Sequence, residues 1–157
     1  MILEACVETI QEAMMAEEKG ADRIELCSNL SIGGTTPSYA VVETAKKILK
    51  IPVMVMIRPR GGSFTYSEME IKKMEQSIEI CKELGIYGVV FGILRPDKTV
   101  DHSLNQRLAD HAENMEITFH KAIDETKHIL DAVRDIMKIK GVSRILTSGG
   151  CTGYTGQ

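Results

Sequence analysis

The chain has few aromatic residues and no tryptophan, since Phe, Trp and Tyr together make up 4% of its 157 residues. Surfaces that bind single-stranded nucleic acid stack bases on aromatic rings, so this scarcity argues against such a surface. Positive charge is not in excess either, because 19 Lys and Arg stand against 22 Asp and Glu, a net charge of -3. We therefore expect no nucleic-acid partner and no attraction to an anionic membrane.

Long hydrophobic runs and closely spaced cysteine pairs are also missing. The apolar runs are shorter than the roughly 20 residues that cross a bilayer, and Met1 leads directly into a strand-like stretch. These absences predict a cytoplasmic protein without a membrane segment. The four cysteines, Cys6, Cys27, Cys81 and Cys151, form no C-x-x-C pair. In the cytoplasm we expect them to be reduced thiols and not disulfides.

What the chain does contain is a regular alternation of short apolar runs and amphipathic stretches. The apolar runs predict strands at 2–7, 23–27, 52–58, 87–94, 116–123 and 144–147. The amphipathic stretches predict helices at 9–19, about 37–50, 68–84, 103–111 and 127–140. Strands that alternate with helices and are nearly all apolar are typical of a parallel sheet buried on both faces, so the fold class is α/β.

Two architectures fit this alternation, an open doubly wound sheet and a TIM (β/α) barrel. No G-x-G-x-x-G follows the first strand, which weakens the dinucleotide-binding version of the open sheet. Polar residues stand near the ends of nearly every strand, as in a barrel. A closed barrel needs eight strands and typically about 250 residues, whereas we count about six βα units. We expect one domain over 1–157, the N-terminal portion of a barrel whose last two units are missing.

One short motif, an apolar residue followed by Glu-x-Cys, occurs twice. It places Glu4 and Cys6 in the first strand and Glu25 and Cys27 in the second. Residues two apart in a strand share a face. If the two strands are parallel neighbours, we expect the two carboxylates and two thiols on one wall at matching heights. Thiolates are soft ligands that select Cu(I), so Cys6 and Cys27 are the candidate metal ligands. The alternative is that both are small buried hydrophobes.

Three residues are candidates for acid–base catalysis: Glu4, Glu25 and His120. Two acids that face one cavity would raise the pKa of one of them. The alternative is an internal ion pair of these acids with Arg58. His120, at the end of the fifth strand, could be a general base, a proton shuttle or a third metal ligand, and otherwise a hydrogen-bonded core histidine.

A second group of residues suits a small anionic ligand. Arg58 and Arg60 can each clamp a carboxylate or a phosphate, although the position of Arg60 favours a solvated loop charge and Arg58 is the preferred ligand contact. The candidate ligand-binding set is completed by Thr118, Asp124, Ser148, Gly149 and Gly150, the last three offering backbone N–H groups after the sixth strand. Met54 and Met56 could supply thioether ligands to copper, but their spacing favours core packing.

Several motifs together make the chain resemble a known family. They are 3–7 (Leu-Glu-Ala-Cys-Val), 20–28 (Gly-Ala-Asp-Arg-Ile-Glu-Leu-Cys-Ser), 33–38 (Gly-Gly-Thr-Thr-Pro-Ser), 52–62, 88–92, 118–120 and 146–150. The sequence resembles the CutC family, described as copper homeostasis proteins with a TIM-barrel fold. It departs from the family at 120–124, where His-Lys-Ala-Ile-Asp stands in place of His-Arg-Ala-Phe-Asp, and in lacking the last two βα units with their Gly-rich loop.

The resemblance implies cuprous copper binding, and Cys6 and Cys27 match the cysteines associated with that role. Our first hypothesis is a copper homeostasis protein that holds Cu(I) between them. The second is a barrel enzyme acting on a small anionic substrate, with Arg58 binding the anion and Glu4, Glu25 and His120 handling protons. Unpaired edges at the first and sixth strands would favour pairing with another chain, so we also expect a homo-oligomer.

Overall fold

A single parallel sheet with sequential strand order organises the protein, as shown by a computed structural model that describes residues 1–150. The predicted α/β fold is therefore confirmed, and the strand order is that of a (β/α) barrel, not the switched order of a doubly wound sheet. The strands are β1 (Glu4–Val7), β2 (Arg23–Leu26), β3 (Val53–Met56), β4 (Gly88–Phe91), β5 (Glu116–Phe119) and β6 (Val142–Ile145). Residues 151–157, which include Cys151, lie outside the described residues.

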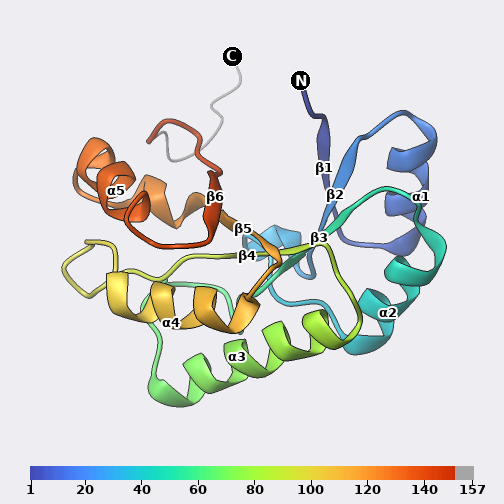
Figure 1. Ribbon diagram of the computed structural model, residues 1–157. Coiled ribbons are helices and arrows are strands. Elements are labelled where there is room, and N and C mark those ends of the chain that lie inside the picture. The colour runs from blue at the N-terminus through green and yellow to red at the C-terminus, as the bar shows by residue number, and fades with distance from the viewer. Residues whose placement is uncertain (151–157) are drawn as a thin grey trace.

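Helices follow the strands and lie along one side of the sheet. They are α1 (Ile10–Glu18), α2 (Tyr39–Ile48), α3 (Glu68–Glu83), α4 (His102–Ala112) and α5 (Ile129–Ile136). Figure 1 shows them as an outer arc that runs from α1 through α3 to α5, with the sheet curving inside it. Within residues 1–150, β1 and β6 each pair with a neighbouring strand on one side alone.

Most strands are shorter than the sequence predicts. Cys27, Arg58 and His120 were expected at the carboxyl ends of their strands, and they lie just beyond them, because β2 ends at Leu26, β3 at Met56 and β5 at Phe119. Short 3₁₀ helices, η1 (Leu30–Ile32) and η2 (Lys121–Glu125), occupy the connections after β2 and β5. The three side chains therefore stand at the carboxyl ends of the strands, where barrel proteins place their sites.

The main hydrophobic core lies between the sheet and the helices. Side chains from the outer face of the strands, such as Ile24, Val55, Phe91 and Phe119, are fully buried there. A separate, smaller cluster on the inner face joins Cys27, Met54, Met56 and Val90. The alternation of side chains along each strand thus divides the sheet into an outer face under the helices and an inner face that carries the candidate site.

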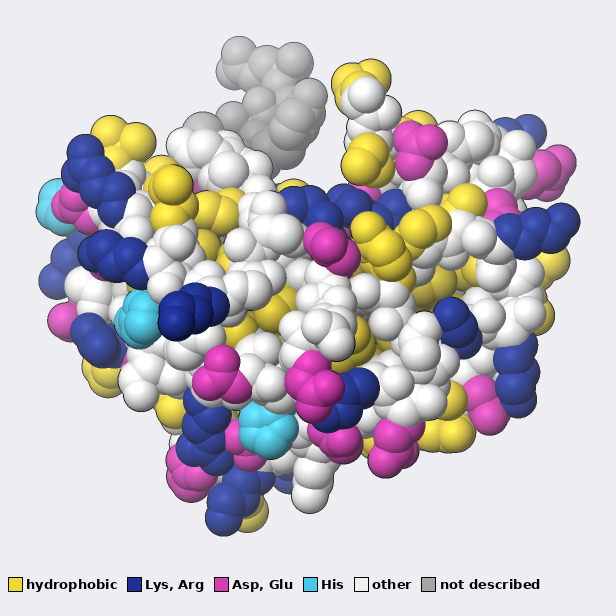
Figure 2. Space-filling view, in the orientation of Figure 1, with side chains coloured by type: hydrophobic (Ala, Val, Ile, Leu, Met, Phe, Trp, Pro, Cys, Tyr) yellow, Lys and Arg dark blue, Asp and Glu magenta, His cyan; other side chains and the backbone are white. Residues whose placement is uncertain are grey.

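Helix boundaries follow the local capping chemistry. Ser67 accepts a hydrogen bond from the Glu70 N–H while the Glu70 carboxylate accepts from the Ser67 N–H, which fixes the start of α3. Across the described part of the chain, no helix combines the length and the apolar character needed to span a bilayer. Figure 2 shows acidic and basic side chains interspersed over the face in view, without a field of one sign.

Candidate functional site

The carboxyl ends of β1 and β2 bring two thiols and one carboxyl group together. Cys6 Sγ lies 3.8 Å from Cys27 Sγ, and the two sulfurs lie 3.9 Å and 3.7 Å from Glu25 Oε1. One potential ligand atom from each of these three residues falls within 4.8 Å of the others. Of the two carboxylates and two thiols expected on one wall, the geometry brings Cys6, Glu25 and Cys27 together.

The expected matching of the two Glu–Cys pairs is wrong, because the strands pair with a stagger. Glu4 stands opposite Arg23, and Cys6 stands opposite Glu25. The Glu–Cys pair of β2 is thus shifted by two residues toward the carboxyl end relative to the pair of β1. Cys6 therefore lies beside Glu25, and Cys27 lies two residues further along. Glu4 instead forms an ion pair with the Arg23 guanidinium and lies outside the thiol cluster.

The three clustered groups differ in exposure and in protonation. Cys6 is exposed, whereas Cys27 is fully buried. Burial, followed by the negative charge of Glu4, raises the pKa of the Glu25 carboxyl to about 7. The hydrogen bond with Cys6, together with burial, raises the pKa of the Cys27 thiol well above its usual range. At neutral pH Cys27 is therefore a protonated thiol, and a bound metal ion must displace its proton.

A cavity of about 390 Å³ opens over this cluster. It is lined by Cys6, Glu25, Cys27, Leu30, Gly33, Met56, Phe64, His120, Lys121 and Leu146. Its walls are mostly apolar, with the thiols and the Glu25 carboxyl on β1 and β2 and His120 and Lys121 after β5. A volume of this size suits a small organic molecule as well as a metal ion.

His120 is buried in the cavity wall with one ring nitrogen engaged. Its Nδ1 accepts a hydrogen bond from the Ala122 N–H, so the proton of the neutral ring is on Nε2. Nε2 has no hydrogen-bond partner among the described residues. Burial, with the Arg58 charge nearby, lowers the pKa of His120 to about 3. The ring is therefore a neutral hydrogen-bond donor at ordinary pH. The general-base role of His120 stays a prediction, and the lowered pKa does not support it.

Arg58 does not form the predicted ion pair with Glu4 or Glu25. Its guanidinium donates hydrogen bonds to three backbone carbonyls, those of Ile32, Gly34 and Gly62. The buried Nε has no partner within residues 1–150, and the guanidinium carbon lies 4.6 Å from the centre of the Phe64 ring. Arg58 thus holds the loops after β2 and β3 beside the cavity.

Arg60 faces away from the cavity, since it pairs with Glu70 at 2.6 Å and donates to the carbonyls of Gly61, Ser63 and Thr65. Its side chain is 40% exposed. It therefore orders its own loop against the start of α3, which fits the reading as a loop charge better than a role as a ligand clamp.

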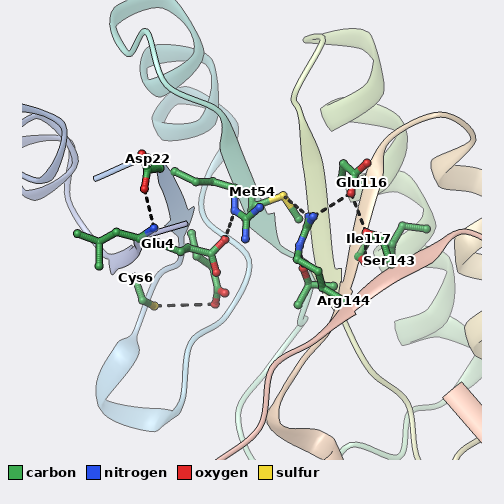
Figure 3. A network of polar contacts seen from close by, with 12 residues as sticks. Glu4, Cys6, Asp22, Met54, Glu116, Ile117, Ser143 and Arg144 are labelled. Carbon is green, nitrogen blue, oxygen red and sulfur yellow. Dashed lines mark hydrogen bonds and ion pairs between the residues drawn. The ribbon is translucent and has the colours of Figure 1, made fainter. Parts of the chain in front are cut away.

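The remaining predicted ligand residues bond to one another. The Asp124 carboxylate accepts hydrogen bonds from the backbone N–H groups of Ser148 and Gly150, and Gly149 N–H donates to the Thr147 hydroxyl. Of the three backbone donors that were expected to bind an anion, two are thus occupied by the chain's own carboxylate and the third by the Thr147 hydroxyl. Thr118 accepts a hydrogen bond from Arg144, which also contacts Glu116 and Met54 Sδ (Figure 3).

Five cavity residues were not predicted as part of a site, namely Leu30, Gly33, Phe64, Lys121 and Leu146, and Met56 was assigned to core packing. Lys121 directly follows His120, and within residues 1–150 its ammonium makes no hydrogen bond or ion pair. That position was noted only as a departure from the family motif. Phe64 and Leu30 lie in loops whose course the periodicity does not give, so the sequence carried no signal for them.

A sequential parallel (β/α) sheet that gathers two thiols, an acid and a buried histidine around a cavity at its carboxyl strand ends defines a barrel-type α/β protein with a candidate site at that end. A model of the CutC family matches residues 1–155. The chain belongs to the CutC family.

Relatives agree with this assignment. The chain is 44% identical over 149 residues to a CutC family protein from Parabacteroides distasonis, covering 94% of this chain and 61% of that one. It is 45% identical to the human copper homeostasis protein cutC homolog, covering 94% and 54% respectively. The chain thus spans little more than half the length of these curated relatives.

Solved structures show the same fold. A structure described as CutC from Streptococcus agalactiae aligns with a TM-score of 0.91 at 35% identity, covering 98% of this chain and 76% of that one. A sialic acid aldolase from Ruminococcus gnavus aligns with a TM-score of 0.65 at 12% identity, covering 94% and 53%. The second likeness shows a shared fold alone.

Proposed function

We propose that this chain acts in copper homeostasis by binding one Cu(I) ion between Cys6 and Cys27. The observation that carries the proposal is the 3.8 Å separation of the two sulfurs at the floor of an open cavity. Soft thiolate ligands favour Cu(I) over the harder divalent ions. The names of the human and mouse relatives, both copper homeostasis protein cutC homologs, support the same function.

The donor set fits Cu(I) for a second reason. Cys6 is exposed and can receive an ion from solvent or from a carrier, whereas Cys27 is buried and can retain it. Both sulfurs already contact Glu25 and each other, so little side-chain rearrangement is needed when the ion enters. A binding site whose ligands are in place loses less conformational entropy on binding.

The test is a competition titration in which the protein takes Cu(I) from a chromophoric chelator under strictly reducing conditions. We expect one tightly held Cu(I) per chain in the wild type. The double variant that combines Cys6→Ser and Cys27→Ser should lose at least about a hundredfold in Cu(I) affinity. Cys81→Ala is the matched control, because Cys81 is a buried thiol on α3 outside the cavity. Equal affinity in the double variant and the wild type would contradict the proposal.

We also propose that the protein works in the cytoplasm, where thiols stay reduced and able to bind metal. The free edges of β1 and β6 within the described residues support association into a homo-oligomer, because unpaired strand edges recruit further strands. Sedimentation velocity over a range of concentrations tests the association. A monomer at every concentration would contradict it.

A second candidate function is catalysis on a small anionic substrate, and one observation favours it. The unpartnered Nε2–H of His120 faces a cavity much larger than a metal ion, with Lys121 at its rim. A carboxylate or phosphate could accept from both groups while the Glu25 carboxyl faces its other end. Titration with small carboxylates followed by NMR of the His120 ring tests this. We expect the ring signals to shift in the wild type as the carboxylate is added, and an unchanged spectrum would discard this function.

A further inference from the structure

Two sulfur ligands alone do not complete the metal site. Thiolate bonds to a filled-shell ion such as Zn²⁺ are about 2.3 Å long, so a linear two-sulfur arrangement would separate the sulfurs by about 4.6 Å. The sulfurs of Cys6 and Cys27 are 3.8 Å apart. An ion bound to both is therefore held at a bent angle, which leaves one side open for a third ligand.

Glu25 is the nearest further group, but its chemistry is unsuitable. A carboxylate oxygen is a hard ligand that prefers Mg²⁺, Ca²⁺ or Mn²⁺ to Cu(I). His120 lines the same cavity, yet its ring nitrogens are not among the ligand atoms that lie within 4.8 Å of one another. A third soft ligand has to come from another residue of the cavity wall.

Met56 has the position and the chemistry. Leu26 on β2 stands opposite Val55 on β3, so the next residues along, Cys27 and Met56, are neighbours at the strand ends. Both side chains belong to the inner-face cluster and line the cavity. Gly34 packs against both side chains. A Cβ atom at this glycine would lie 3.4 Å from Cys27 Sγ and 3.6 Å from Met56 Cε.

Met54 shows that this placement is specific to Met56. It lies two residues earlier on the same face of β3, but it does not line the cavity. Its Sδ contacts the Arg144 guanidinium at 3.6 Å instead, as Figure 3 shows. A thioether that faces a cation is a poor candidate for a second positive ion, whereas Met56 lines the cavity beside Cys27.

We propose that the Met56 thioether is a third ligand of the Cu(I) ion held by Cys6 and Cys27. This inference rests on the proposed function, since it concerns the same ion. Thioether sulfur is a soft ligand and carries no charge, so it adds a bond to Cu(I) without adding a negative charge to the buried end of the site.

The test compares Met56→Leu with Met54→Leu, a matched control on the same strand and face. Leucine and methionine have similar volumes, so both variants should fold, which circular dichroism and the melting temperature verify. We expect Met56→Leu to weaken Cu(I) binding at least about tenfold in the chelator competition. Removing a group that only hydrogen-bonds to a metal ligand already lowers metal affinity by about 10- to 100-fold. Met54→Leu should bind as the wild type does.

X-ray absorption at the copper edge provides a measurement that needs no variant. We expect three sulfur neighbours around copper in the wild-type protein and two in Met56→Leu. Two sulfurs in the wild type, or an affinity unchanged in Met56→Leu, would overturn the role of Met56 and leave the two-cysteine site standing. If the wild type bound no Cu(I) at all, the proposed function itself would fail.

Discussion

The outer and inner faces of the sheet are built from the same strands but carry different chemistry. Along β2–β5 the outer face is entirely apolar, with Ile24, Leu26, Val53, Val55, Val89, Phe91, Ile117 and Phe119. The inner face of the same strands carries Arg23, Glu25, Met54, Met56, Gly88, Val90, Glu116 and Thr118. The outer face buries hydrocarbon against the helices, which stabilises the fold.

The inner face makes the opposite contribution, because burying charged and polar groups costs free energy unless each is paired. Arg23 is paired with Glu4, and Arg144 with Glu116, while Glu25 contacts two thiols and His120 keeps a nitrogen without a partner. Unsatisfied and soft groups therefore collect where ligands are expected to bind. Substitutions on the outer face should change stability, and those at the inner strand ends should change binding.

The largest effect is expected from the outer face. Phe91→Ala removes a fully buried ring between β4 and the helices, and we expect the free energy of unfolding to fall by about 3–5 kcal/mol. Urea denaturation followed by circular dichroism measures it. Tyr39→Ala, at a half-exposed position, is the control and should change little. A loss below about 1 kcal/mol in Phe91→Ala would break the contrast between the faces.

A pH-dependent effect is expected from His120. Because its pKa is lowered to about 3 in the folded protein, below the ordinary value of 6.5, the unfolded chain takes up a proton first as the pH falls. Stability should therefore be full above pH 6.5 and be lost below it, by up to about 1.4 kcal/mol per pH unit from this residue. Besides the Arg58 guanidinium, the Phe64 and Phe119 rings and the Ala122 N–H face this histidine.

The measurement is urea denaturation between pH 6.5 and 4.5 for the wild type and His120→Asn, whose amide oxygen can replace Nδ1 as the acceptor from Ala122. We expect the wild type to lose about 2–3 kcal/mol more than the variant over this range. His128→Gln, at an exposed position, should behave as the wild type does. Parallel pH profiles for the wild type and His120→Asn would contradict a buried neutral ring.

A smaller effect is expected from the ion pair deep on the inner face. Glu4→Gln leaves the buried Arg23 guanidinium without its acid, and we expect a loss of about 1–2 kcal/mol, since Glu4 is partly exposed. Copper stoichiometry should not change, because Glu4 lies outside the thiol cluster. If Glu4→Gln lost Cu(I) binding while its stability stayed unchanged, Glu4 would belong to the metal site, as the sequence analysis expected.

The smallest effect is expected at Arg60. Arg60→Gln removes a partly exposed ion pair with Glu70, and such pairs are worth about 0–1 kcal/mol. Neither Cu(I) affinity nor the melting temperature should change appreciably. A clear loss of anion or copper binding in this variant would show that the Arg60 side chain acts in the cavity.

The sequence predicted the architecture better than the site, for a physical reason. Hydrophobic periodicity records which residues pack under the helices, so the order of strands and helices could be predicted from it. The stagger between β1 and β2 depends on how the outer faces of separate strands pack together, which no local pattern contains. For that reason Glu4 was expected beside the thiols and instead pairs with Arg23.

Strand lengths were the second source of error. The predicted strands ran on through Cys27, Arg58 and His120 because these residues follow apolar runs without a break, whereas the strands end at Leu26, Met56 and Phe119. The bonds of Asp124 to Ser148 and Gly150 join segments more than 20 residues apart, and only the folded chain brings them together. Met56 was assigned to core packing. The residue is indeed buried, but the sequence did not indicate that the Cys27 thiol lies beside it.

The central claim is that the two thiols at the strand ends, Cys6 and Cys27, hold one cuprous ion. Native mass spectrometry of protein purified from copper-supplemented cells under reducing conditions tests it most directly. The predicted result is one copper per chain in the wild type and in Cys81→Ala, and none in the double serine variant of Cys6 and Cys27. Copper retained by that variant, or absent from the folded wild type, would contradict the claim.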